Sequence, residues 1–351
     1  DQAIVRENSS KPIKKGRILL EFNGEPIIRK NTLTVIKGKT GVHKSRLAQQ
    51  ICSVLISDNA TKRSAIGFTV IDDKPTKVIY IDTERNLTEH FPEAIQSILE
   101  NAGYDKFTKS ELLEYFTFIG LNRPQRLEGI RLITKLVRHH NHNDKENHIV
   151  VVLDVVSDCI INFNDLEETY LLTDEFARCT NNYNVTFIAV IHENPDAIRS
   201  TKARGHLGTE IANKASAIIQ ISRCVGHPNR FMINIEKSRS SQVPKPIYVT
   251  YEDNINCLLI CDAPVPKEDK IITQLLDYLT KIDGLEISKA DLEKGTGIKR
   301  TTLDRKLKDI VDSRLQVEIN GNSFLVVLGK TGKSAVVKLK QASSSEEDEE
   351  D

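Results

Sequence analysis

Short apolar runs alternate with segments of helical periodicity between residues 32 and 222. The runs are rich in β-branched residues and are apolar on both faces, which is typical of parallel strands covered by helices on each side. We expect strands at 31–38, 77–84, 115–120, 148–156 and 185–193. We expect helices between them, at 45–57, 90–103, 126–140 and 165–183. The alternation predicts an α/β fold with a mostly parallel sheet flanked by helices.

Three shorter strand-like segments follow, at 216–223, 230–239 and 246–253. Turn residues separate them, so we expect them to extend the sheet in antiparallel fashion. The next segment, 263–270, combines two prolines with dense charge, a composition typical of a linker. The large domain is therefore expected at 29–262, preceded by a polar N-terminal arm at 1–28.

Residues 271–329 have a different character. Two short helices and a basic amphipathic helix are followed by two alternating strands around Asn320-Gly321, a strong signal for a β-hairpin. Three helices and a hairpin predict a small winged-helix domain. Residues 330–351 change from basic to acidic, and we expect this tail to be disordered.

The composition limits the class of protein. No run approaches 18 consecutive apolar residues, so we expect no membrane-spanning helix, and the polar N-terminus lacks the apolar core of a secretory signal. Six scattered cysteines without a C-x-x-C favour reduced thiols in a cytoplasmic protein. The last six residues are acidic, and the remainder holds 49 basic against 43 acidic residues. This mildly basic body is compatible with a nucleic-acid partner.

The sequence IKGKTGVHKS at 36–45 nearly matches the phosphate-binding loop G-x-x-x-x-G-K-[ST], with His43 in place of the second glycine. An apolar strand precedes it and a helix follows, so backbone N–H groups and the helix dipole would meet a phosphate there. The candidate residues for binding ATP are Gly38, Lys39, Thr40, Gly41, Val42, His43, Lys44, Ser45 and Arg46.

Within this loop, Lys44 is expected to reach the β- and γ-phosphates and Ser45 to ligate Mg²⁺. His43 is expected to adopt a positive φ, at a cost of about 1–2 kcal/mol. That cost is small beside several phosphate hydrogen bonds, so binding is expected to survive. The similar GKTGKS at 329–334 has the wrong spacing and no following helix, and we do not expect it to bind phosphate.

Polar residues end three of the predicted strands. Asp154 ends IVVVLD, where a carboxylate would face the Mg²⁺ shell through water. Glu84 ends the predicted strand KVIYIDTE and could polarise the attacking water; an acidic turn, DTERN, that starts a helix is the alternative. Asp82 alternates with Glu84, so one of the two should face the site. His192 ends VTFIAVIH and could sense the γ-phosphate; a capped surface histidine is the alternative.

Basic residues mark three further places. The loop 193–208 carries Arg199, Lys202 and Arg204, which could hold a nucleic-acid backbone. Lys237 and Arg239 lie two apart on a strand and therefore on one face, where they could reach a neighbouring subunit's γ-phosphate; two solvated charges are the alternative.

The third helix of the second unit is the third basic place. A basic helix in a winged-helix domain could enter the major groove of DNA, and a protein-binding winged helix is the alternative. The candidate DNA-binding residues there are Lys299, Arg300, Arg305 and Lys306.

Together these motifs resemble the RecA-like P-loop ATPases, and their order is most similar to the hexameric RepA/DnaB-type replicative helicases. RadA and KaiC are more distant relatives. The stretch 190–221 is similar to the sensor region of RepA-like ATPases of bacterial plasmids, and the whole chain resembles AAA-family proteins of Bacteroidetes-type mobile elements. The resemblance covers about 28–260 and departs from the family at His43.

The resemblance implies a role for each matching residue. Lys44 and Ser45 would hold phosphates and Mg²⁺, and Asp154 would orient the metal through water. Glu84 would be the catalytic base and His192 the γ-phosphate sensor. The Lys-x-Arg pair would act on the nucleotide of a neighbouring subunit, which implies a homo-oligomer, with a hexamer favoured.

Two functions remain open at this point. The first is an ATP-hydrolysing helicase or DNA remodeller that serves replication or mobilisation of a mobile element. The second is a non-catalytic regulator that binds ATP as an assembly switch and DNA through its winged helix. A small-molecule kinase is disfavoured, because no lid-like segment follows the phosphate-binding loop.

Overall fold

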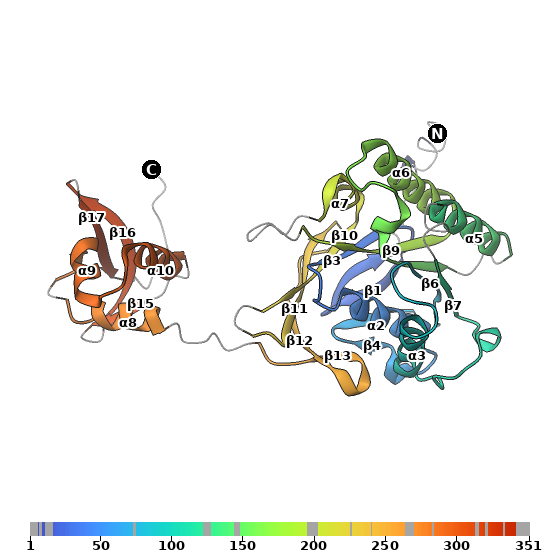
Figure 1. Ribbon diagram of the computed structural model, residues 1–351, viewed down its shortest axis with the longest axis horizontal. Helices are drawn as coiled ribbons and strands as arrows, with labels where there is room; N and C mark the ends of the chain where they lie inside the picture. The colour runs from blue at the N-terminus through green and yellow to red at the C-terminus, as the bar shows by residue number, and fades with distance from the viewer. Residues whose placement is uncertain are drawn as a thin grey trace. The chain divides into compact units, whose positions relative to one another are not determined.

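The computed structural model describes residues 6, 9–10, 17–72, 75–121, 128–143, 148–194, 203–224, 227–239, 241–263, 270–282, 284–312, 316–319, 322–332 and 334–341. The chain divides into two compact units, residues 1–264 and 265–351 (Figure 1). No helix of the described residues is both long and apolar enough to cross a membrane.

A nine-stranded sheet forms the centre of the first unit, in the order β13-β12-β11-β10-β3-β9-β8-β6-β7. Its parallel strands are β3 (Leu33–Gly38), β6 (Lys77–Asp82), β7 (Phe116–Gly120), β8 (Ile149–Asp154), β9 (Val185–His192) and β10 (Ala217–Arg223). The antiparallel extension is β11 (Arg230–Ser238), β12 (Ile247–Glu252) and β13 (Cys257–Ile260). The predicted fold class is confirmed. One detail was wrong: the segment 216–223 is parallel to β3, so the antiparallel part begins one strand later.

Helices cover both faces of this sheet. On one face lie α2 (Lys44–Ile56) and α3 (His90–Ala102); on the other lie α5 (Gly129–Asn143), α6 (Leu166–Asn182) and α7 (Gly205–Lys214) (Figure 1). The alternation along β3 shows why: Val35 packs into the core beside α6 and α7, whereas Ile36 packs into the core beside α2. Short 3-10 turns lie at Ala60–Lys62, Ser110–Leu112, Val156–Cys159 and Asp253–Ile255. Helix α7 was not predicted, because 193–208 was assigned to a loop.

A second, smaller sheet corrects the predicted N-terminal arm at 1–28. Strands β1 (Ile18–Phe22), β2 (Glu25–Arg29), β4 (Ser64–Ala65) and β5 (Phe68–Val70) pair in the order β2-β1-β5-β4. Its side chains Leu20, Phe22 and Phe68 are fully buried in the same core as α2. Residues 18–28 thus belong to the folded unit, because β1 pairs with a strand more than forty positions away, a partner that local patterning cannot reveal.

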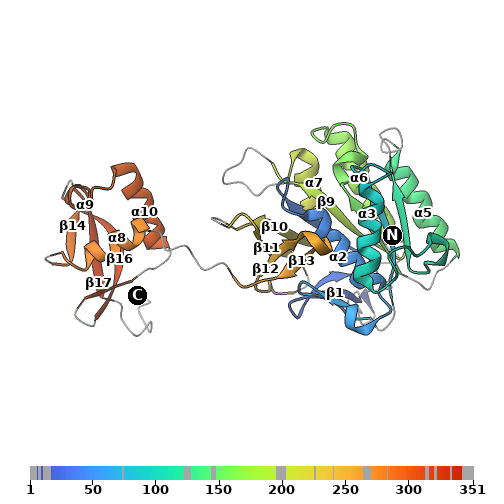
Figure 2. The same cartoon turned by 60° about the horizontal axis from the view of Figure 1, so that its bottom comes forward.

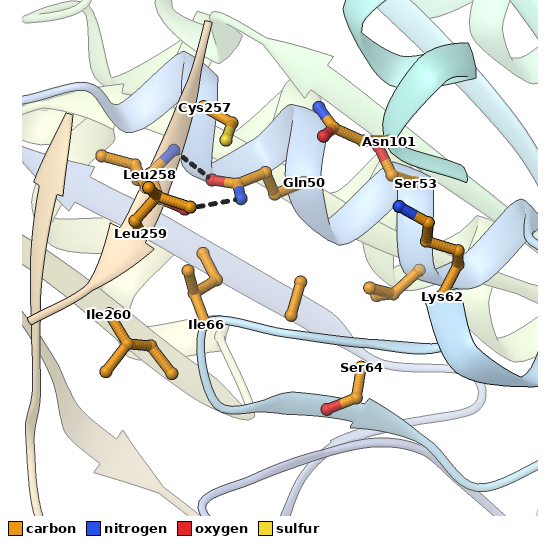
Figure 3. A pocket seen from close by; sticks show the side chains of 12 residues that line it. Gln50, Ser53, Lys62, Ser64, Ile66, Asn101, Cys257, Leu258, Leu259 and Ile260 are labelled. Carbon is orange, nitrogen blue, oxygen red and sulfur yellow. Dashed lines mark hydrogen bonds between the residues drawn. The ribbon is translucent and has the colours of Figure 1, made fainter. Parts of the chain in front are cut away.

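The outermost strand, β13, is fastened to α2 by one side chain. The Gln50 carboxamide donates to the Leu258 carbonyl oxygen at 2.9 Å and accepts from the Leu258 N–H at 3.0 Å. Figure 3 shows this pair at the edge of a 340 Å³ cavity that Lys62, Asn101 and Ile260 also line. The antiparallel extension is therefore held against the helix that follows the phosphate-binding loop (Figure 2).

The second unit has its own hydrophobic core. Its elements are α8 (Lys270–Leu279), β14 (Glu286–Ser288), α9 (Lys289–Thr296), α10 (Arg300–Asp312), β15 (Gln316–Ile319), β16 (Asn322–Thr331) and β17 (Ser334–Gln341). The strands pair in the antiparallel order β14-β17-β16-β15. Ser288 caps α9 by accepting from the Asp291 N–H, and Gly297 ends it in the left-handed conformation.

The three predicted helices and the hairpin of the second unit are present, with Asn320-Gly321 itself outside the described residues. The disordered tail predicted at 330–351 was wrong over 334–341, which form β17 and complete the sheet. Residues 342–351 lie outside the described residues. The GKTGKS stretch includes the end of β16 and the start of β17, so a strand and not a helix follows it.

His148, at the start of β8, makes the stability of the first unit pH-dependent. Burial lowers the pKa of His148 from 6.5 to about 4, against an opposing hydrogen bond to Asn184. As the pH falls, His148 takes up its proton in the unfolded chain before it does so in the folded protein, because its pKa is higher in the unfolded chain. The free energy of unfolding is therefore expected to fall by about 3 kcal/mol as the pH drops from 6.5 to 4. Chemical denaturation of His148→Gln should show a smaller loss over that window. A His90→Gln control, at a side chain 65% exposed, should keep the wild-type loss.

Candidate functional site

The phosphate-binding loop joins the end of β3 to the start of α2. Gly41 has φ 75° and His43 has φ 65° with ψ 31°, so the predicted positive φ at His43 is confirmed. At Gly38 a Cβ atom would lie 2.4 Å from the Ile221 carbonyl oxygen, so only glycine fits there. The loop keeps the left-handed turn of a phosphate-binding loop although its second glycine is missing.

The His43 side chain is directed toward the antiparallel extension. Its ring stacks on Tyr251 of β12 at 4.3 Å between centroids and meets Phe231 of β11 edge-on at 4.8 Å. Burial, followed by the charges of Arg46 and Arg223, lowers the pKa of His43 below its ordinary value. Aromatic contacts of this kind contribute about 0.5–1.5 kcal/mol, which offsets much of the strain of a left-handed histidine.

Arg223, at the end of β10, is a loop contact that sequence reasoning missed. Its Nη2 donates to the Gly41 carbonyl oxygen at 3.1 Å, and its guanidinium lies 5.5 Å above the Phe231 ring. Arg46 instead donates to Gln49 Oε1 on its own helix at 3.0 Å. The loop is thus held by side chains from β10, β11 and β12, the strands on one side of β3 in the sheet.

The predicted phosphate and metal residues lie together. Lys44 Nζ, 5% exposed as a residue, donates to the Lys39 carbonyl oxygen at 2.8 Å. Burial lowers the pKa of Lys44, while Asp154, Glu84 and Glu193 raise it. Ser45 Oγ donates to Asp154 Oδ1 at 3.1 Å, so the two predicted metal residues touch.

These oxygen donors fit Mg²⁺. This ion keeps several waters and takes one or two protein oxygens together with nucleotide phosphates, so a three-residue cage is not needed. The described residues contain no group of three or more His, Cys, Asp or Glu that could hold a metal alone. A hydroxyl and a carboxylate in contact beside a helix N-terminus are compatible with Mg²⁺ held together with nucleotide phosphates.

Of the two acidic residues at the end of β6 and just after it, Glu84 faces the site and Asp82 does not. Asp82 Oδ1 accepts from the backbone N–H groups of Glu84 at 3.0 Å and Arg85 at 2.8 Å, and its Oδ2 pairs with the Arg85 guanidinium. Burial raises the pKa of Asp82, against the opposing effect of Arg85. Asp82 therefore shapes the turn that presents Glu84.

Glu84 and His192 meet across the site. His192 Nε2 lies 3.3 Å from Glu84 Oε1, and this hydrogen bond is the main cause that lowers the pKa of Glu84. His192 Nδ1 is buried and has no hydrogen-bond partner in the described part of the chain. A 490 Å³ cavity opens beside these two side chains and Thr40 of the phosphate-binding loop. The predicted base and sensor are thus brought together, next to a space that a reacting phosphate and water could occupy.

The basic loop after β9 is described only at its ends. Arg199 and Lys202 lie outside the described residues. The Arg204 N–H donates to the His192 carbonyl oxygen at 2.9 Å, and its guanidinium packs 4.4 Å above the Phe163 ring at the same cavity. Glu193 and Ala203 form a β-bridge. Both ends of the loop therefore meet beside the predicted sensor.

Lys237 and Arg239 lie on one face, as predicted, but far from the phosphate-binding loop of their own chain. Lys237 Nζ donates to the Ala212 carbonyl oxygen at 2.7 Å, and Arg239 Nη2 donates to that of Asn213 at 2.5 Å, at the end of α7. Ser238 of β11 pairs with Ala217 of β10, which pairs with Thr34 of β3. Lys237 and Arg239 therefore lie beside the first residues of β3, whereas the phosphate-binding loop follows the last residue of that strand.

The basic residues of the second unit divide into paired and exposed ones. Arg300 pairs with Glu293 at 3.8 Å and with Asp304 at 3.5 Å. Lys306 pairs with Asp309 at 3.1 Å. Lys299 and Arg305 are exposed on or next to α10. These two are the better placed for phosphate contacts.

No protein-family model and no curated protein matches the sequence. Solved structures do match. A KaiC-like protein from the archaeon Pyrococcus horikoshii OT3 is 16% identical (72% of this chain, 99% of that one, TM-score 0.45). The RadB recombinase is 17% identical (66% and 92%, TM-score 0.45), and the flagellar accessory protein FlaH of Methanocaldococcus jannaschii is 18% identical (67% and 91%, TM-score 0.44). This likeness assigns neither a ligand nor an activity to the chain.

Substitution of His43 tests the left-handed backbone. We expect His43→Val to lower the free energy of unfolding by about 1–2 kcal/mol more than His43→Asn does. Both variants lose the ring, but asparagine tolerates a positive φ and valine does not. Chemical denaturation of the nucleotide-free protein measures the difference. Equal losses in the two variants would contradict the positive φ at this residue.

Proposed function

We propose that this protein binds and hydrolyses ATP and acts on DNA, as a RepA/DnaB-like helicase or DNA remodeller in the replication or mobilisation of a mobile element. The observation that carries the proposal is the pair of contacts at the ends of parallel strands. Ser45 touches Asp154 and Glu84 touches His192, all beside one phosphate-binding loop.

The roles of the residues follow from these contacts. The loop N–H groups and Lys44 would bind the phosphates, and Ser45 with Asp154 would hold Mg²⁺, which neutralises charge on the phosphates. Glu84, whose pKa is lowered by His192, stays ionised and can accept a hydrogen bond from a water molecule that attacks the γ-phosphate. His192 can lose or gain a partner as that phosphate leaves.

The DNA part of the proposal rests on the basic residues. The loop that begins and ends beside His192 carries Arg199, Lys202 and Arg204. Loss of the γ-phosphate at His192 would therefore alter the position of this loop and its proposed contacts with a DNA backbone. We also propose that the second unit is a winged helix with α10 as its DNA-contacting helix. The position of Lys237 and Arg239, away from their own loop, supports a homo-oligomer in which they serve a neighbour's nucleotide; a hexamer is favoured.

Two substitutions separate binding from hydrolysis. We expect Lys44→Ala to lose most ATP affinity, because the loop loses its phosphate-binding cation. Glu84→Gln should keep ATP affinity within about threefold while phosphate release falls by about 10²–10⁴-fold, since the amide cannot act as a base. Equilibrium nucleotide binding and steady-state phosphate release, with and without single-stranded DNA, measure both.

The same measurements decide between the two functions. Phosphate release by the wild type that rises with single-stranded DNA supports the motor. Tight ATP binding without release in the wild type supports the alternative, a regulator that uses ATP as an assembly switch. Phosphate release that occurs in the wild type and persists undiminished in Lys44→Ala would refute both.

The second unit makes a separate prediction. Replacement of Lys299 and Arg305 together by alanine should reduce the salt dependence of duplex binding by the full chain, by about 0.9 in the log–log slope for each lost phosphate contact. Fluorescence anisotropy across a salt series measures the slope. Arg300→Ala is the control with a smaller expected effect, because Arg300 is paired with two carboxylates. An unchanged slope in the double variant would argue for a protein-binding second unit.

A further inference from the structure

We infer that Arg85 is a positioning residue that fixes both the metal-side carboxylate of Asp154 and the turn that presents Glu84. This inference rests on the proposed Mg²⁺–ATP site and deepens it. Sequence reasoning gave Arg85 no role, yet its guanidinium contacts the Asp154 carboxylate directly and, through Asp82, supports the turn that carries Glu84.

Asp82 and Asp154 form a close pair of buried acids. They are register partners on the neighbouring parallel strands β6 and β8, and they are 2% and 1% exposed. Neighbouring strands are about 4.8 Å apart, so two ionised carboxylates here repel each other in a poorly solvated place. Arg85 Nη1 pairs with Asp82 Oδ2 and lies 3.2 Å from Asp154 Oδ2. One cation thus compensates both acids.

The two oxygens of Asp154 face different partners. Oδ1 accepts from the Ser45 hydroxyl, on the side of the phosphate-binding loop. Oδ2 accepts from the Tyr80 hydroxyl at 2.9 Å and from Arg85 at 3.2 Å. Because Tyr80 and Arg85 both bind Oδ2, they restrict rotation of the Asp154 carboxylate. Oδ1 therefore stays directed at the proposed metal position beside Ser45. Groups that orient a metal ligand in this way change metal affinity without touching the metal.

The same guanidinium supports the turn before Glu84. Asp82 accepts from the backbone N–H groups of Glu84 and Arg85 with one oxygen and from the Arg85 side chain with the other. This closed turn directs Glu84 toward His192. Arg85 therefore links Asp154, the proposed metal-binding residue, to the turn that carries Glu84, the proposed base, through a single side chain.

The position requires a cation. Burial lowers the pKa of Arg85, but the effects of Tyr80, Asp154 and Asp82 raise that pKa by more, so the group stays charged. Nη1 alone contacts Asp82 Oδ2, Asp154 Oδ2 and the Tyr80 hydroxyl. A lysine ammonium also carries several N–H donors on one nitrogen, but its side chain differs in length and shape, so we expect it to replace these contacts only in part.

The experiment measures Mn²⁺ binding by electron paramagnetic resonance, in the full-length protein saturated with a non-hydrolysable ATP analogue. We expect Arg85→Met to weaken Mn²⁺ binding by about 10–100-fold and Arg85→Lys to recover part of the loss. Tyr80→Phe, which removes one donor to the same oxygen, should cause a smaller loss. Arg178→Met, at an ion pair on α6, is the matched control and should leave Mn²⁺ affinity unchanged.

A second readout isolates the orientation effect. Binding of a fluorescent ADP in EDTA should stay within about threefold of wild type in Arg85→Met, because the phosphate-binding loop is untouched. Unchanged Mn²⁺ affinity in Arg85→Met would overturn the inference while leaving the proposed function intact. Absence of Mn²⁺–nucleotide binding in the wild type would overturn the proposed function, and the inference with it.

A further variant covers the case in which Arg85→Met does not fold because two buried acids lose their cation. The double variant Asp82→Asn, Arg85→Met removes one of those acids and should show the same Mn²⁺ loss, since Asp154 Oδ2 still lacks the Arg85 guanidinium and keeps only the Tyr80 hydroxyl. Wild-type Mn²⁺ affinity in the double variant would overturn the inference.

Discussion

The register of the parallel strands is the constraint on which the site depends. Gly38 of β3 pairs with His192 of β9, and Asp82 of β6 pairs with Asp154 of β8, so the ends of these four adjacent strands meet at one edge of the sheet. The register of β8 with β9 places His192 two residues beyond the level of Asp154. A parallel sheet brings carboxyl ends to one edge, and its burial between helices keeps that edge rigid. A shift of one residue in any strand would turn the polar end of that strand away from the loop.

His43, which replaces the second glycine of the phosphate-binding loop, shows how the fold tolerates a strained backbone conformation at one residue. A left-handed histidine is strained, and its ring would obstruct the loop if it were directed at the phosphates. Here Phe231 and Tyr251 hold the ring on the side of the antiparallel strands, and Arg223 bonds the loop from the same side. The strain at one residue is thus offset by contacts from strands almost two hundred positions later, and the loop geometry survives.

The sequence predicted the central sheet and the members of the site, because both depend on local patterns. Apolar alternation gave the parallel strands, and Asp154, Glu84 and His192 stand at their ends. It missed whatever depends on distant pairing: β1 with β5, Gln50 with Leu258, and His43 with Tyr251. Arg85 was missed for another reason. Its neighbours Asp82 and Glu84 drew attention as acids, but a cation between two buried carboxylates has no sequence signature until the register of the strands is known.

On the proposed function, the charges of the site bear on how a neighbouring copy would assist hydrolysis. Transfer of the γ-phosphoryl group develops negative charge that a cation must meet. On that proposal Lys44 would bind the phosphates, whereas Arg85 is paired with Asp82 and Asp154. Arg204 packs on Phe163 at the rim of the cavity, and Lys237 and Arg239 lie by the opposite end of β3. Because Lys237 and Arg239 lie away from the phosphate-binding loop of their own chain, the proposed function assigns them to a nucleotide bound by an adjacent copy. On the proposed function, assembly would therefore complete the site as well as surround the DNA.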